Sequence, residues 1–197
     1  MAKERGFNIN NYSEEDEDIQ TFDAGHILGS RAILIDSSIF YTGDFALRPR
    51  AFLGSGKATK CDVLIMETTF GSPEYIFPPL AKVLEQTNRL IAEMFSKGVP
   101  VVLMGYPLGK SQILSHYFSF WDPIYVYESI AKMNSAHTEL GVSLGTNFKK
   151  YEEAKEKRLL NRKPWVLLSP LMSGRSKFVK ELKEENGAVS VAFSGWA

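Results

Sequence analysis

The chain has 197 residues, of which 44% are hydrophobic and 12% aromatic, which is enough apolar material for one ordinary domain or two small lobes. Lysine and arginine together number 23, as do aspartate and glutamate, so no global basic field indicates a nucleic-acid partner. Any nucleic-acid binding therefore has to be local, weak and sensitive to salt. Cys61 is the single cysteine, which excludes an internal disulfide and favours a cytoplasmic location. No apolar stretch approaches the roughly 18 residues of a membrane span, so no membrane partner is expected.

The first third of the chain predicts a β-hairpin. Residues 31–35 and 39–41 are short apolar runs separated by Asp36, Ser37 and Ser38, which is typical of two strands joined by a turn. The apolar run 63–66 predicts a further strand, buried in the protein.

The rest of the chain alternates between two apolar patterns. Short β-branched or aromatic runs predict buried strands at 99–104, 124–127, 166–168 and 189–193. Helical spacing of apolar residues predicts helices at 79–96, 111–118, 128–140, 148–160 and 173–185. Strand, helix and strand repeated in this way predict right-handed crossovers and a mostly parallel sheet. The sequence therefore predicts an α/β protein with two lobes of different character.

Three polar residues stand beside predicted strands, where sites collect in α/β proteins. His26 lies between glycines on a loop that enters the hairpin, which suits a metal ligand or a general base, although a simple turn residue is commoner. Asp44 follows an apolar strand and a glycine, and its carboxylate can bridge two cations or cap a turn. Glu67 ends an apolar run, where an acid either finds a partner or turns to solvent.

Two further groups are candidates for binding substrate phosphates. Lys110 and Ser111 open a predicted helix, where backbone amides favour an anion. The segment 105–111 is not a P-loop, because three residues rather than four separate its glycines. Arg48 and Arg50 form a small basic cluster beyond Asp44. For Lys110 and for the arginines, a solvated side chain is an equally good explanation.

The order of His26, Asp44 after a glycine, and Glu67 before Thr68 and Thr69 resembles the metallo-β-lactamase motifs found in β-CASP nucleases. These nucleases include enzymes of mRNA 3′-end processing, J-type ribonucleases, DNA-repair nucleases and archaeal exonuclease-like relatives. Further similarity extends through 105–112, 123–127, 165–174 and 194–197. The resemblance implies a partial metallo-β-lactamase lobe in 1–75, a β-CASP lobe with a mostly parallel sheet flanked by helices in 76–170, and a return segment toward the lactamase lobe in 171–197.

The resemblance also implies a two-zinc centre that hydrolyses phosphodiester bonds of single-stranded RNA or DNA. Asp44 would bridge the ions, His26 would bind one of them, and Glu67 would orient a histidine that acts as the acid. The chain contains no His-x-His-x-Asp-His segment, which supplies most of the ligands in this family. We therefore expect a truncated or split β-CASP nuclease that is inactive alone, and a homo-oligomer or a complementing polypeptide. The alternative is a catalytically dead module that binds nucleic acid or a partner.

Overall fold

The chain divides into two compact units, residues 1–75 and 76–197. The computed structural model describes residues 18–162 and 164–195. Strands and helices are combined as expected, and the predicted α/β class with a parallel sheet is confirmed. Within the described ranges, no helix is both long enough and apolar enough to cross a membrane.

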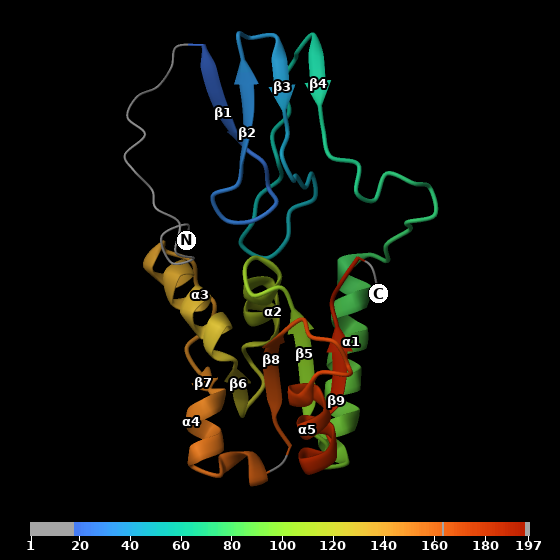
Figure 1. Ribbon diagram of the computed structural model, residues 1–197, viewed down its shortest axis with the longest axis vertical. Coiled ribbons are helices and arrows are strands. Elements are labelled where there is room, and N and C mark those ends of the chain that lie inside the picture. Colours follow the sequence, from blue (N-terminus) through green and yellow to red (C-terminus); the bar gives the residue numbers. More distant parts are fainter. Residues whose placement is uncertain (1–17, 163, 196–197) are drawn as a thin grey trace. The chain divides into compact units, whose positions relative to one another are not determined.

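The first unit is built on a four-stranded sheet in the order β1-β2-β3-β4 (Figure 1). Its strands are β1 (Ile19–Asp23), β2 (Arg31–Ile35), β3 (Ile39–Tyr41) and β4 (Val63–Ile65). The first three pair in antiparallel fashion, whereas β4 runs parallel to β3. The predicted hairpin of β2 and β3 is confirmed.

The hairpin turns through two residues in the left-handed region, Asp36 with φ of 50° and Ser37 with φ of 53°. The amide of Ser38 donates to the carbonyl oxygen of Ile35 at 2.9 Å and closes the turn. Positive φ at both central positions defines a type I′ turn, whose twist matches that of the two strands.

The two faces of this sheet differ in burial. One face forms a small core of Ala32, Leu34 and Phe40, together with Ala24 from the loop that follows β1. On the opposite face, the strand register aligns seven apolar side chains that are all at least partly exposed. We call these residues the isoleucine face: Ile19, Ile33, Ile35, Ile39, Tyr41, Val63 and Ile65.

The prediction of a buried strand at 63–66 is wrong. Val63, Leu64 and Ile65 are each about half exposed, at 49%, 53% and 50%. The cause is position: β4 has β3 on one side only, and it lies at the edge of the sheet. An apolar run therefore does not by itself reveal whether a strand is central or at an edge.

The second unit contains a five-stranded sheet in the order β7-β6-β8-β5-β9, and every pair in it is parallel. Its strands are β5 (Val101–Gly105), β6 (Ile124–Val126), β7 (Lys149–Lys150), β8 (Val166–Pro170) and β9 (Val189–Ala192). The helices are α1 (Leu80–Ser96), α2 (Lys110–Phe118), α3 (Glu128–Glu139), α4 (Tyr151–Glu156) and α5 (Lys177–Asn186), with a 3₁₀ turn at Leu159–Asn161.

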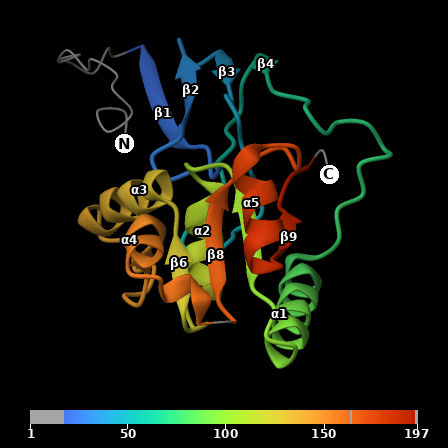
Figure 2. The ribbon, with the colours of Figure 1, turned by 60° about the horizontal axis from the view of Figure 1, so that its bottom comes forward.

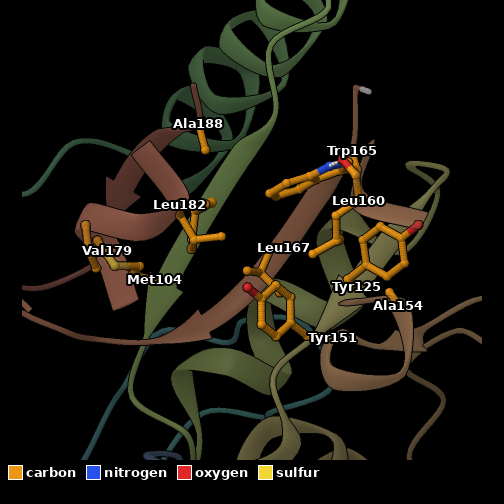
Figure 3. Packing of buried hydrophobic residues seen from close by; sticks show 11 residues of the cluster. Met104, Tyr125, Tyr151, Ala154, Leu160, Trp165, Leu167, Val179, Leu182 and Ala188 are labelled. Atoms are coloured by element: carbon orange, nitrogen blue, oxygen red, sulfur yellow. Dashed lines mark hydrogen bonds between the residues drawn. The ribbon is translucent and has the colours of Figure 1, made fainter. Parts of the chain in front are cut away.

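Helices cover both faces of the parallel sheet. Alternate strand residues such as Leu103, Ile124 and Leu168 join a core under α1, α2 and α3. The other set joins a second core with α4 and α5, so that α5 and α2 lie on opposite sides of the sheet (Figure 2). This second core includes Trp165, Leu167 and Leu182, whose side chains are drawn in Figure 3. Burial on both faces is characteristic of parallel sheets and explains their continuous apolar strands.

Besides the exposure of β4, the structure differs from the predicted elements in four places. The strand predicted as buried at 189–193 forms, but it lies at the edge of its sheet, and Ser190 and Ala192 are exposed. Ile19–Asp23 forms a strand that the sequence pattern did not predict. The single helix predicted at 148–160 is wrong, because a two-residue strand, a short helix and a 3₁₀ turn occupy that range. The helix predicted at 173–185 begins only at Lys177, where the side chain of Ser176 caps it.

Candidate functional site

His26 lies on the loop that joins β1 to β2, and side chains of the same loop hold its backbone. Asp23 Oδ1 accepts the amide of Gly25 at 2.8 Å. Ser30 Oγ accepts the amides of His26 and Ile27, each at 3.2 Å. Such local side-chain bonds replace the missing strand partners in a tight turn and fix its course.

The His26 loop interlocks with the loops that follow β3. The amide of Ala46 donates to the carbonyl oxygen of Ala24 at 2.9 Å, and the amide of Gly56 donates to that of Ala46 at 2.8 Å. A Cβ atom on Gly25 would lie 2.4 Å from both the carbonyl oxygen of Ala46 and the nitrogen of Gly56. Gly25 also has a φ of +67°, so only glycine allows the loops to approach this closely.

This approach places His26 beside Asp44. The imidazole Nε2 and the carboxylate Oδ2 are 3.8 Å apart, and the two side chains are 39% and 72% exposed. The structure therefore brings together the two residues that were predicted as metal ligands, at a solvent-accessible place.

Glu67 connects the end of β4 to the Asp44 loop. Its Oε1 accepts the amide of Phe45 at 3.2 Å. A hydrogen bond from the side chain of Thr69 is the main cause that lowers the pKa of Glu67, with smaller contributions from the amide of Phe45 and the charge of His26. These hydrogen bonds and the nearby His26 therefore favour the ionised form of Glu67.

The two arginines of the basic cluster have different surroundings. Arg50 is half-buried, and its Nη2 donates to the carbonyl oxygen of His26 at 2.8 Å. Burial lowers the pKa of its guanidinium. Arg48 is exposed and makes no hydrogen bond or ion pair with the residues that the structure describes.

Lys110 and Ser111, in the second unit, begin α2 as predicted. Lys110 is partly exposed, and its side chain covers Gly105 so closely that a Cβ there would lie 2.8 Å from Lys110 Cγ. Ser111 is fully buried, and its hydroxyl donates to the carbonyl oxygen of Gly105 at 3.3 Å. The hydroxyl of Ser111 is therefore engaged in a hydrogen bond within the protein interior.

The sequence pattern does not indicate the buried polar network that the structure shows at the start of α2. Gln112 Oε1 accepts the amide of Gly109 at 2.8 Å, while Nε2 donates to the carbonyl oxygen of Pro107 at 3.1 Å and to Asn134 Oδ1 at 3.0 Å. Asn134 in turn donates to Ser115 Oγ at 3.0 Å. Polar residues on a helix usually face water, so only the structure reveals that Gln112 points inward.

Neither His26 nor Asp44 lines two further hollows of the molecule. One, of about 250 Å³, is apolar and lies on the core face of the first sheet beside Phe40, Phe45 and Met66. The other, of about 500 Å³, lies in the second unit between α3 and the segment that leads into β7.

The His26–Asp44 pair fits part of a zinc site. Two ligands of one tetrahedral zinc ion, each bound at about 2.0–2.2 Å, lie about 3.4 Å apart. The 3.8 Å between the His26 and Asp44 atoms needs only a small adjustment to reach that spacing. Within 18–162 and 164–195, no group of three or more histidine, cysteine, aspartate or glutamate residues is placed to hold a metal ion. The described residues thus bring two possible ligands together and do not form a complete metal centre.

The chain is homologous to nucleases of the β-CASP branch of the metallo-β-lactamase superfamily. An RNase J-like protein of Methanocaldococcus jannaschii is 31% identical over 113 residues, which are 53% of this chain and 27% of that protein. The Integrator complex subunit 11 homolog of Dictyostelium discoideum is 30% identical over 143 residues, which are 66% of this chain and 19% of that protein.

A third relative carries a different name. A probable DNA ligase of Opitutus terrae is 34% identical over 180 residues, which are 88% of this chain and 17% of that protein. The chain thus spans about a sixth to a quarter of the length of these relatives. No protein-family model matches the chain.

Proposed function

We propose that this chain forms part of a metal-dependent nuclease that hydrolyses phosphodiester bonds of single-stranded RNA or DNA. His26 and Asp44 each contribute one ligand to a zinc centre, and other polypeptide segments supply the remaining ligands. Zinc in such a centre would act as a Lewis acid toward the negative charge that develops on phosphate oxygens.

The observation that carries this proposal is the proximity of the His26 imidazole and the Asp44 carboxylate at 3.8 Å on interlocked loops. Both side chains are partly exposed, so an ion can reach them. Glu67 holds the Asp44 loop by accepting the amide of Phe45. The name of the RNase J-like relative supports a nucleic-acid substrate.

The test is a zinc titration followed through the NMR signals of the histidine rings. Zinc is expected to shift the His26 ring signals in the wild type, with weak affinity because only two ligands are at hand. Asp44→Asn should weaken this response, whereas Asp36→Asn, a change in an exposed turn, should leave it unaltered. Equal responses in both variants would contradict a ligand role for Asp44.

The two-ligand site favours a second candidate function, a module that binds nucleic acid or a partner without cleaving. We expect the chain alone, supplied with zinc or manganese, to leave labelled single-stranded RNA and DNA intact, because the described residues do not complete a metal centre. Metal-dependent cleavage that disappears in Asp44→Ala would instead show that this chain is a complete nuclease.

A further inference from the structure

The backbone of His26 is held by a distant side chain. Arg50, which lies 24 positions further along the chain, donates from Nη2 to the carbonyl oxygen of His26 at 2.8 Å. A hydrogen bond from a charged donor to a carbonyl is stronger than one between neutral groups. This contact joins the loop after β1 to the loop after β3.

Arg50 is itself fixed in a tight turn. Its amide donates to the carbonyl oxygen of Leu53 at 3.0 Å, and the amide of Leu53 donates back to Arg50 at 2.9 Å. Leu53 is buried, with 7% of its surface exposed, and anchors the turn in the unit. The half-buried guanidinium therefore projects from a rigid support rather than from a free surface loop.

His26 is thus held from both sides of its backbone. Its amide donates to Ser30 Oγ at 3.2 Å, and its carbonyl oxygen accepts from Arg50. The bond to Ser30 is internal to the loop, so it fixes the shape of the loop. The bond to Arg50 comes from outside and fixes where that loop lies relative to Asp44.

We infer that Arg50 is a positioning residue that sets the His26 imidazole beside Asp44. The neighbouring arginine, Arg48, is exposed and makes no hydrogen bond or ion pair within the described residues. It has no such positioning role. The structural part of this inference stands alone, whereas its consequence for metal binding rests on the proposed function. Arg50 then acts on the ligand pair through the backbone of His26 and does not touch the ion.

The experiment compares Arg50→Met with Arg48→Met, which removes the same charge from a neighbouring exposed position. In metal-free protein, amide hydrogen exchange at His26 and Ile27 should become about tenfold faster or more in Arg50→Met and stay unchanged in Arg48→Met. Exchange at Leu34 in β2 should stay unchanged in both variants, since the effect is local. Arg50→Lys retains a cationic donor and should restore part of the protection.

The second readout is the zinc response of the His26 ring. Arg50→Met should weaken zinc affinity about 10–100-fold, as loss of the groups that orient metal ligands generally does. Unchanged exchange at His26 in Arg50→Met would overturn the inference, and so would loss of protection throughout β2, because Arg50 would then hold the whole unit. Faster exchange at His26 in a protein whose His26 ring never responds to zinc would uphold the positioning role and refute the proposed metal function.

Discussion

Glu67 shows how one carboxylate can organise a site without being its most exposed acid. It accepts hydrogen bonds from Phe45 and Thr69, and these bonds lower its pKa below the ordinary value. Because the folded-state pKa is lowered, the carboxylate stabilises the fold above its unfolded pKa, near 4.5. This contribution is lost as the pH falls through the lower folded-state value.

Replacing Glu67 with glutamine should therefore lower the free energy of unfolding of the first unit at pH 7 by about 1 kcal/mol. The difference from wild type should shrink as the pH falls below about 4.5 and vanish at lower pH, where both side chains are neutral. Urea unfolding followed by NMR signals of β1 to β4 measures this. Glu74→Gln, an exposed neighbour in the same unit, should behave as wild type at every pH, and a constant Glu67→Gln deficit across pH would refute the charge argument.

Sequence pattern and structure agree unevenly at the residue scale. His26, Asp44 and Glu67 were predicted from their places beside strands, and the structure gathers them in one unit. The bond from Arg50 to His26 could not be predicted, because it joins positions 24 residues apart through a turn that no periodic pattern describes. Sequence spacing indicates which side chains share a strand face, but it does not indicate how loops interlock.

At the scale of elements, the β2–β3 turn carries a side chain where glycine would be easier to accommodate. Ser37 has a φ of 53°, although serine lacks the conformational freedom that glycine has in this region. Ser37→Gly should raise the free energy of unfolding of the first unit by about 0.5–1 kcal/mol, because glycine adopts the left-handed region without steric cost. Urea unfolding provides the measurement.

Ser38→Gly is the matched control for this turn. Ser38 Oγ donates to Asp62 Oδ2 at 2.8 Å, and its φ is not positive. Its replacement should therefore lower the free energy of unfolding, opposite in sign to Ser37→Gly. Equal signs for the two glycine variants would mean that turn strain does not determine the stability of the hairpin.

The start of α2 depends on Gln112. Replacing Gln112 with leucine keeps the volume but leaves the amide of Gly109 and the carbonyl oxygen of Pro107 without their buried partner. We expect a loss of about 2–4 kcal/mol in the free energy of unfolding of the second unit. Urea unfolding followed by tryptophan fluorescence reports on this unit through Trp121 and Trp165. Lys180→Met, at an exposed position of α5 in the same unit, is the control and should cost less than about 0.5 kcal/mol.

The fold was more predictable where a single element determines its own pattern. The helices near 79–96 and 128–140 agree closely with α1 and α3, since their apolar spacing reflects burial of one face. The strand Lys149–Lys150 was missed because two lysines carry no strand pattern and pair with β6 only through tertiary structure. The exposure of β4 was missed for the same reason, as its neighbours and not its residues determine its burial.

At the scale of the whole molecule, the isoleucine face should drive association. Ile35, Tyr41 and Ile65 lie on it with 36%, 47% and 50% of their surface exposed. Contiguous apolar patches of this kind usually bind another surface. Two copies of the chain can cover this patch by packing their isoleucine faces against each other around a two-fold axis. We expect a dimer or a larger assembly.

Light scattering coupled to size exclusion measures the assembly state directly. The double variant Ile35→Lys with Ile65→Lys places charges on the isoleucine face and should shift the protein toward monomer. Ile76→Lys alters an apolar residue that is 87% exposed but lies outside this face, and it should leave the assembly unchanged. A wild-type monomer at high concentration would contradict this prediction.

The parallel pairing of β3 with β4 has a consequence for the order in which the protein folds. β1, β2 and β3 are antiparallel neighbours joined by short loops, so they can form early and carry His26 with them. β4 pairs only after the chain from 42 to 62 has closed into a long loop, which costs more entropy and takes longer. That loop carries Asp44, and Glu67 fastens it once β4 is in place. We therefore expect the contact between the His26 imidazole and the Asp44 carboxylate to form late, when the first unit completes its folding.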